Sequence, residues 1–188
     1  DLPARRVEVL RDLGDAILRA GRPGVVDLWI AQLDTTGRKR WHRKLGEVVS
    51  ETIDRFGEQS FNTRAHDLAV DGAGELAVVF TNSTPPGRRA DPHSDTPYVT
   101  YVALFGPDGT RRWLRTVEPG SDTTFPAIAL DAADVLVSGS LTPTDTLLLA
   151  PRRSDGKPRW RTHLNSRESL RTYDLAALPD GRTTPVGE

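Results

Sequence analysis

The chain has 188 residues, in which 25 lysines and arginines nearly balance 26 aspartates and glutamates. This balance argues against nucleic-acid binding, which usually needs a basic domain, and no apolar run reaches the roughly 18 residues that span a bilayer. The sequence contains no cysteine, which excludes disulfides, cysteine nucleophiles and cysteine-ligated zinc.

One type of strand pair, marked by small residues around a tight turn, occurs four times along the chain. The first copy runs from Val7 to Gly21 and turns at Gly14. Further copies cover 67–80, 127–139 and 174–187, and most carry a glycine near the end of the second strand. Short apolar runs between turn residues predict β-strands joined as hairpins.

A second hairpin type alternates with the first and is marked by the spacing Gly-x-x-x-Trp. The three copies are Gly37–Trp41, Gly109–Trp113 and Gly156–Trp160. We expect glycine because the turn needs a positive φ, and we expect the tryptophans, which recur at one position, to pack between blades. Alternation places Trp41, Arg43 and Leu45 on one face of the returning strand, whereas His42 and Lys44 lie on the other.

Two such hairpins together have about 45 residues, the size of a four-stranded propeller blade. Trp113 and Trp160 are 47 positions apart, and longer connections at 47–63 and 83–97 separate the earlier units. We therefore predict an all-β fold of β-propeller-type blades with four antiparallel strands each, about three and a half blades in an incomplete ring. The predicted repeats cover approximately 5–46, 64–118, 126–165 and 172–188 of a single propeller segment, 1–188.

Two segments carry a resemblance to a known family. The segment from Asp27 to Trp41 resembles the SBBP-like β-propeller repeats of bacterial extracytoplasmic proteins, and Ala69–Val78 looks like the second strand pair of the same repeats. The resemblance implies a propeller fold and a secreted, periplasmic or cell-surface location rather than a reaction. Because the chain does not begin with methionine and its hairpins do not make a whole number of blades, we expect a fragment or a processed product.

The Gly-x-x-x-Trp spacing is also similar to the docking motif of quinoprotein propellers. The position of Asp34, three residues after Ala31, departs from that motif, and the other two copies have no aspartate there. We therefore expect no quinone cofactor, and indeed no cofactor of any kind. A fragment of a propeller enzyme, whose active site lies outside this chain, is the alternative that this similarity leaves open.

No complete catalytic or metal-binding motif is present. The segments Asp71–Glu75 and Asp131–Asp134 hold oxygen ligands of the kind that calcium prefers, but we interpret them as hairpin turns, where Asp and Gly are favoured by the backbone. We expect the paired arginines beside turns, including Arg152 and Arg153, to be solvated. Paired carboxylates for glycoside hydrolysis need only proximity in space, so the sequence leaves them open.

Candidate binding residues lie in the long connection 83–97 and at one tryptophan outside the recurring set. His93, between Asp91 and Asp95, brings imidazole and carboxylate groups together without the regular spacing of a metal motif, so we predict no metal site. The candidates are Trp29, Arg88, Arg89, Asp91, His93 and Asp95.

These features favour a non-catalytic, extracytoplasmic propeller segment that acts as a binding or scaffold module, because loops on a rigid frame usually carry binding. The expected partners are a protein or carbohydrate ligand and the rest of a larger propeller, with no nucleic acid and no membrane span. The enzyme alternative is a quinoprotein-like dehydrogenase or a hydrolase.

Overall fold

The computed structural model describes residues 7–11, 28–34, 36–45, 63–82, 99–119, 124–142, 144–167, 172–177 and 183–187. Every element in these ranges is a β-strand, so the predicted all-β class is confirmed. In the same ranges there is no helix with the length and apolar character that crossing a membrane requires.

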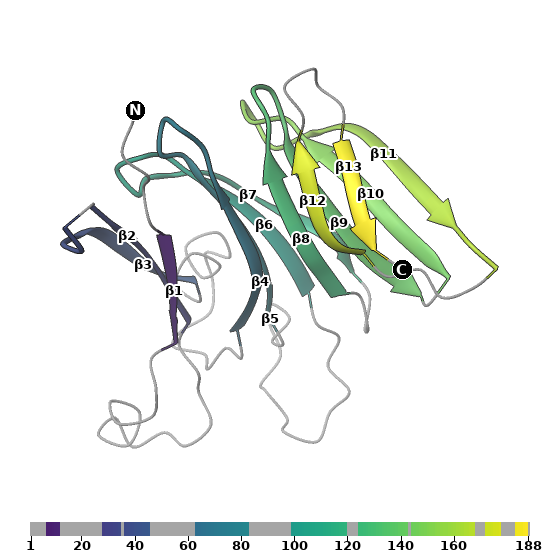
Figure 1. Ribbon diagram of the computed structural model, residues 1–188, viewed down its shortest axis with the longest axis horizontal. Coiled ribbons are helices and arrows are strands. Elements are labelled where there is room, and N and C mark those ends of the chain that lie inside the picture. The colour runs from purple at the N-terminus through teal and green to yellow at the C-terminus, as the bar shows by residue number, and fades with distance from the viewer. Residues whose placement is uncertain are drawn as a thin grey trace, which may run out of the picture.

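The strands form antiparallel sheets that follow one another along the chain (Figure 1). The first sheet has the order β1-β2-β3, with bounds Val7–Arg11, Leu28–Leu33 and Lys39–Lys44. The second has the order β4-β5-β6-β7, with bounds Thr63–Val70, Leu76–Asn82, Val99–Phe105 and Arg111–Pro119. The third has the order β8-β9-β10-β11, with bounds Thr124–Leu130, Val135–Thr142, Asp145–Pro151 and Pro158–Asn165. The last pairs β12 (Thr172–Ala177) with β13 (Thr183–Gly187).

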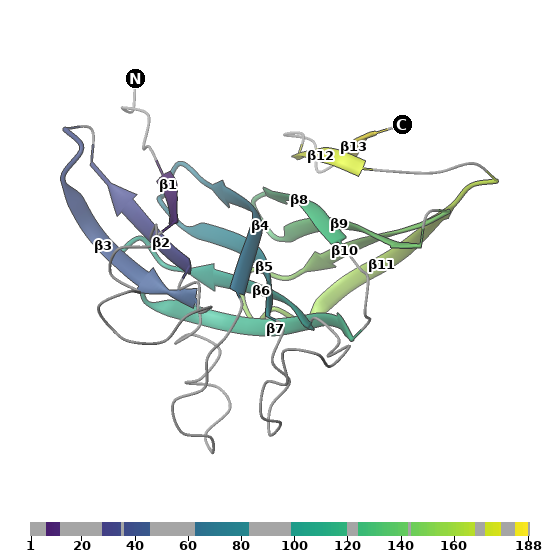
Figure 2. The same cartoon turned by 90° about the horizontal axis from the view of Figure 1, so that it is seen from below.

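The sheets stand face to face in a fan, as the blades of a propeller do. Their first strands lie together on the inner side, where β4 contacts β8 and β8 contacts β12. Figure 2 shows β3, β7 and β11 along the outer arc of the fan. Repetition of four-stranded sheets around one side is the architecture of a propeller. The predicted antiparallel four-stranded blades are therefore confirmed in the second and third sheets.

The first sheet differs from the predicted pattern. Its strand β1 pairs directly with β2, with Val7 opposite Gln32 and Arg11 opposite Leu28. The sequence predicts a hairpin from Val7 to Gly21 whose second arm precedes β2. Residues 12–27 themselves lie outside the described ranges.

Hydrophobic side chains fill the space between successive blades. Leu76, Val78 and Phe80 of β5 belong to the cluster that faces the first blade. Their neighbours Ala77 and Val79 belong to the cluster that faces the third blade. All five are fully buried. The continuous apolar run in the sequence therefore has a physical reason, because the middle blade is covered on both faces.

Candidate functional site

The glycine turns join adjacent blades. Gly37, Gly109 and Gly156 have φ values of 82°, 79° and 69°, which confirms the predicted need for glycine. A Cβ atom on Gly109 would lie 2.6 Å from Cδ2 of Trp41 in the first blade, and one on Gly156 would lie 2.7 Å from Cδ2 of Trp113 in the second. The recurring motif is thus a joint in which the tryptophan of one blade lies on the turn of the next.

Polar contacts reinforce each joint. The indole N–H, and an arginine two residues after the tryptophan, donate to backbone carbonyls of the neighbouring turn. The bonds are Trp41 Nε1 to Pro107 O (3.1 Å), Arg43 Nε to Gly109 O (3.0 Å), Trp113 Nε1 to Arg153 O (2.9 Å) and Arg115 Nη2 to Asp155 O (2.7 Å). Trp113 is only 5% exposed, so the prediction that it packs between blades is confirmed.

Arg153 is the charged centre of the joint between the second and third blades. Its guanidinium pairs with the carboxylates of Asp71 and Glu75, and its Nη1 donates to Asp131 O (2.7 Å). Only 17% of its side chain is exposed. The expectation that Arg153 is solvated is therefore wrong. The turn that carries it lies over the acidic turn of the preceding blade, where two carboxylates offset the cost of burying its charge.

The acidic turns are held by their own side chains. Asp71 Oδ1 accepts a hydrogen bond from Glu75 N (2.9 Å), and Asp131 Oδ1 accepts from Ala133 N (2.7 Å). The interpretation of both segments as hairpin turns is therefore confirmed. Burial by itself opposes ionisation of Asp71, but the bonds from Arg153 and from the Glu75 backbone outweigh it and hold the pKa of Asp71 below its usual value.

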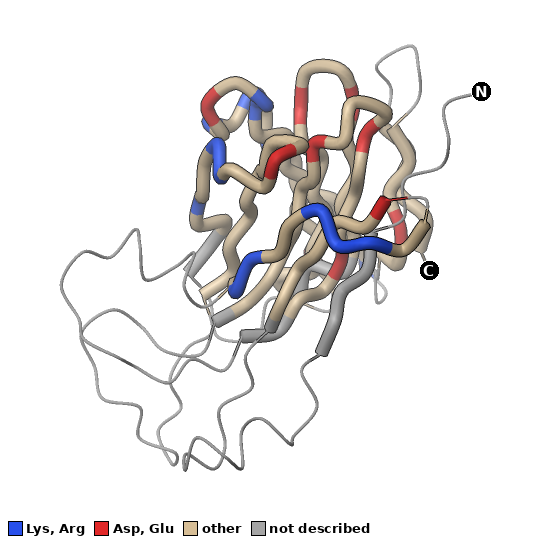
Figure 3. The backbone as a smooth tube through the Cα atoms, turned by 90° about the vertical axis from the view of Figure 1, so that its left-hand side faces the viewer, with Lys and Arg blue, Asp and Glu red and all other residues tan. Residues whose placement is uncertain are grey.

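The residue before each of the last two recurring tryptophans pairs with a buried acid of its own blade. Arg112 pairs with Glu75, and Arg159 Nε lies 3.0 Å from Asp134 Oδ1. The acid side chains are only 8% and 7% exposed, respectively. Burial raises the pKa of Asp134, although the nearby Arg159 opposes the rise. Figure 3 shows acidic and basic residues gathered around the turns at this end of the blades.

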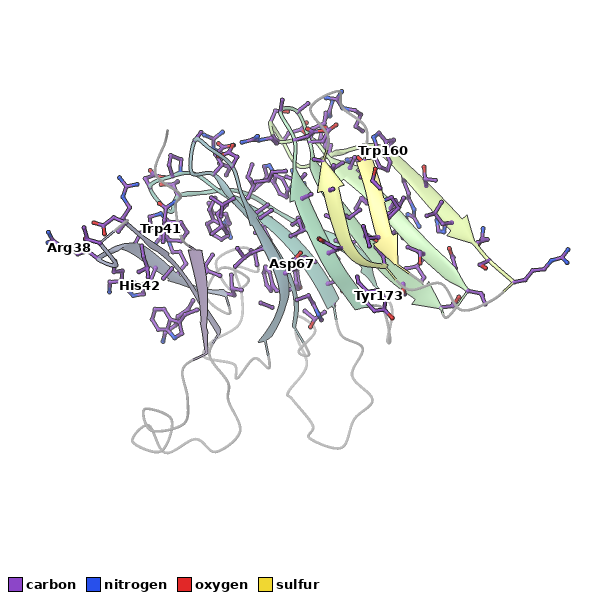
Figure 4. The ribbon with its side chains drawn as sticks, in the orientation of Figure 1. Arg38, Trp41, His42, Asp67, Trp160 and Tyr173 are labelled. Atoms are coloured by element: carbon purple, nitrogen blue, oxygen red, sulfur yellow. The ribbon has the colours of Figure 1, made fainter. Side chains whose placement is uncertain are left out.

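An open depression of about 630 Å³ lies beside Trp160. Its lining comes from the turn after β8, from the ion pairs described above and from β12, and consists of Asp71, Leu130–Asp134, Arg153, Arg159, Trp160 and Ala177. Trp160 occupies the sequence position of Trp41 and Trp113 in the repeat and packs against the cluster between the third blade and β12. Figure 4 shows it near the upper end of the third blade.

Trp29 lies on the face of the first sheet opposite to Trp41. Its ring centroid is 4.8 Å from that of His42, and Lys44 Nζ lies 4.9 Å from the centre of its ring. His42 and Lys44 lie on the face opposite to Trp41, as the alternation predicts, and His42 is exposed, as expected. The side chain of Trp29 itself is half-buried. Its role in binding stays a prediction, since a cation over an aromatic ring also stabilises a sheet surface.

The remaining candidates, Arg88, Arg89, Asp91, His93 and Asp95, lie outside the described residues. The strands that flank them are described. Asn82, at the end of β5, pairs with Val99 at the start of β6, and Thr63 at the start of β4 pairs with Asn82. The connections predicted at 47–63 and 83–97 therefore attach at one end of the second blade. The turns at Gly74 and Gly109 lie at its opposite end.

The innermost strand carries a carboxylate that the sequence reasoning did not single out. Asp67 Oδ2 accepts from Ile128 N of the next blade (3.0 Å), and Asp67 Oδ1 accepts from Leu68 N (2.8 Å). Burial raises the pKa of Asp67 and the charge of Asp174 adds to the rise, although the two backbone bonds oppose it. Figure 4 shows Asp67 in the middle of the fan. The repeated Asp-Leu-Ala at 67–69 and 174–176 was the signal that could have revealed it.

Replacing Asp67 by asparagine should change the stability at pH 7 less than Asp67→Ala does, because removal of the buried charge offsets the loss of one of the two acceptor oxygens. Because the folded state raises this pKa, the folded chain binds the proton more tightly than the unfolded chain, and the charge costs stability at neutral pH. The native chain should therefore gain stability relative to Asp67→Asn as the pH falls through the raised pKa. Urea unfolding at several pH values measures this difference. Asp67→Ala, which removes the acceptor for Ile128 N, should instead cost about 1–2 kcal/mol. Equal effects of the two substitutions at pH 7 would contradict the assignment.

Comparison with known proteins gives a distant structural likeness. No protein-family model matches the chain, and the search of curated proteins found no match. Among solved structures, the chain is similar to the β-propeller domain of Nup133 from Vanderwaltozyma polyspora, with 9% sequence identity and a TM-score of 0.43. The match covers 89% of this chain and 50% of the other, so the chain spans about half the length of that structure.

Proposed function

We propose that the chain is a propeller-type binding or scaffold module that works outside the cytoplasm. The observation that supports this role is the difference between the two ends of the blades. At one end, tryptophan–glycine joints and the ion pairs of Arg153 tie the turns together. At the other end, the strand registers place the attachment points of both long connections at the same end of the second blade. Variable loops on a rigid frame are the usual carriers of binding.

The connection 83–97 offers chemistry for hydroxyl and carboxylate groups. Arg88 and Arg89 supply guanidinium donors, and His93 lies between two carboxylates, Asp91 and Asp95, in the sequence. Carbohydrates present both hydroxyls and carboxylates, so we propose a surface polysaccharide as the ligand. The resemblance of the segment from Asp27 to Trp41 to extracytoplasmic repeats supports a location where such ligands occur.

Binding to an array of defined bacterial polysaccharides tests this role. The full chain should bind at least one member of the array, and the double variant Arg88→Ala/Arg89→Ala should bind it at least tenfold more weakly. The matched control Arg38→Ala/Arg40→Ala removes the same charge from two exposed positions at the opposite end, one in the turn before β3 and one at the start of β3, and should leave binding unchanged. A chain that binds no member of the array, or equal losses in the two variants, would overturn the proposal.

The location has its own test. An antibody against the chain should detect it in the secreted, periplasmic or surface fraction of the cells that produce it. Recovery in the cytoplasmic fraction would refute the proposed location without affecting the binding role.

A further inference from the structure

A small cavity of about 110 Å³ lies between the outer strands of the second and third blades. Part of its lining comes from β7 and β11, which follow the outer arc of the fan in Figure 2. Both blades that enclose the cavity have four described strands, so it lies between complete blades. Its walls are mostly aliphatic and come from both blades: Val102, Val117, Leu147, Leu149, Pro151 and Pro158.

Side chains fill the corresponding space between the first and second blades. Leu114 and Arg161 each follow the recurring tryptophan, and Phe105 and Pro151 each follow the residue paired with it. Phe105 and Leu114 are 0% and 9% exposed, and both belong to the cluster that faces the first blade. The third blade has a proline and an arginine at these places. The ring and the branched chain that fill the first joint are therefore missing from the second, and a cavity results.

Two arginines, one from each blade, also line this cavity, and none of the described lining residues is acidic. Arg115 pairs across the sheet with Val102, and Arg161 pairs with Leu149. Each arginine thus lies beside an aliphatic part of the wall. Both arginines are exposed, so their guanidinium groups are in contact with solvent.

The surroundings leave the site positively charged. Arg115 donates to two backbone carbonyls, one of which is Asp155 O (2.7 Å), and these bonds use two of its five N–H groups. Arg161 Nε donates to His163 Nε2 (3.4 Å), and His163 pairs with Asp145 (3.1 Å). Even with the carboxylate of Asp145 counted, the two arginines give the site a net positive charge.

These walls and charges suit a short hydrocarbon chain that ends in a carboxylate. Aliphatic walls favour hydrocarbon, because its burial removes apolar surface from water. Guanidinium groups bind carboxylates through charge-assisted hydrogen bonds. An apolar cavity of about 150 Å³ holds the six carbons of benzene. A cavity of about 110 Å³ therefore has room for about four carbon atoms.

We propose that this cavity binds a short aliphatic carboxylate such as butyrate. The hydrocarbon lies against Leu147 and Leu149, and the carboxylate lies between Arg115 and Arg161. Because both blades contribute, the ligand takes the place that Phe105 and its neighbours fill in the first joint. The inference goes beyond the proposed polysaccharide binding, which concerns the connection 83–97, and either can fail while the other holds.

Butyrate is the probe, titrated into the full 188-residue chain with ¹³C-labelled leucine and valine methyl groups. The methyl signals of Val102, Leu147 and Leu149 should shift along a saturable one-site curve in the millimolar range. The signals of Leu45, which is buried in the first joint, should not move. Butyramide has the same chain without the charge and should bind at least about tenfold more weakly. Each CH₂ removed, from butyrate through propionate to acetate, should weaken binding about fourfold.

Variants of Arg161 test the site from the side of the protein. Arg161→Gln should weaken butyrate binding at least about fivefold, because it removes one of the two charges. Arg161→Leu introduces the side chain that Leu114 supplies in the first joint. It should abolish binding and leave the urea midpoint for unfolding unchanged or higher. The matched control Arg38→Gln removes a charge from an exposed position of the first blade and should leave binding unchanged.

Three results would overturn the proposal. They are the absence of a saturable shift at the three cavity methyl positions, equal binding of butyrate and butyramide, and equal losses in Arg161→Gln and Arg38→Gln. The ligand series uses the native chain, so it decides the question even if a variant does not fold.

Discussion

Replacing Gly109 by alanine should destabilise the folded chain by about 3–4 kcal/mol. A left-handed backbone costs a non-glycine residue about 1–2 kcal/mol, and overpacking of a filled site costs about 1–3 kcal/mol more. The new Cβ atom would lie 2.6 Å from Cδ2 and 2.8 Å from Cγ of Trp41, atoms close to the backbone of a side chain that cannot easily move away. Urea unfolding followed by tryptophan fluorescence measures the change.

The same substitution at Gly37 is the matched control. Gly37 has nearly the same φ, 82° against 79°, but nothing lies within 4 Å of the position of its Cβ atom. Gly37→Ala should therefore cost only the backbone strain, about 1–2 kcal/mol. The difference between the two variants isolates the contact between blades. If the two losses of stability are equal, Trp41 does not lie on the Gly109 turn.

Replacing Arg153 by methionine should cost about 3 kcal/mol, since it leaves Asp71 and Glu75 without the cation they share. Removal of one partner from a buried ion pair costs more than the intact pair contributes, because the remaining charge is left uncompensated. Glu75 keeps its pair with Arg112, which limits the loss. The triple variant Arg153→Met/Asp71→Asn/Glu75→Gln should recover most of the stability. Urea unfolding of the three proteins at pH 7 gives the comparison.

The stability of the Arg153→Met variant should also depend less on pH in the acid range than that of the native chain. In the native chain the pKa of Asp71 is lowered on folding, so its contribution is present above the unfolded pKa and is lost as the pH falls through the folded pKa. Without Arg153 that contribution is smaller, because only the backbone hydrogen bonds to Asp71 then oppose the effect of burial, so the Arg153→Met variant should lose less stability in acid than the native chain does. Arg152→Met is the control, because Arg152 is 43% exposed and pairs within its own turn with Asp155. It should cost less than about 1 kcal/mol. An equal cost for the two arginines would refute the role of Arg153.

Local patterns in the sequence predicted most of the fold. Alternation along 41–45 places Leu45 in the core, Trp41 against the same core cluster and His42 outside, as the structure shows. The glycines of the Gly-x-x-x-Trp turns are confirmed at positive φ. These features depend on the period of a strand and on the geometry of a two-strand turn, both of which act over a few residues. The same patterns predicted four-stranded units, but they did not predict the angle between neighbouring units.

Features that depend on how blades face one another could not be predicted in the same way. Arg153 and Glu75 are 78 positions apart, and nothing distinguishes Arg153 in the sequence from its neighbour Arg152. Whether either is buried depends on where the next blade places its turn. The depression at Trp160 also depends on how the blades are arranged, because no described turn covers Trp160 as the Gly109 and Gly156 turns cover Trp41 and Trp113. The pairing of β1 with β2 was missed because an apolar run does not specify its neighbour.

Hydrogen exchange of the indole N–H groups tests the central claim, that tryptophan–glycine joints hold the blades together and that Trp160 lacks its joint. The chain is labelled with ¹⁵N-tryptophan, and the signals are assigned with single Trp→Phe variants. The Trp113 signal should exchange slowly, because this N–H donates to Arg153 O and the side chain is 5% exposed. The Trp160 signal should exchange quickly, because it faces the open depression. Exchange of Trp160 as slow as that of Trp113, or exchange of Trp113 as fast as that of Trp160, would contradict this account of the blades.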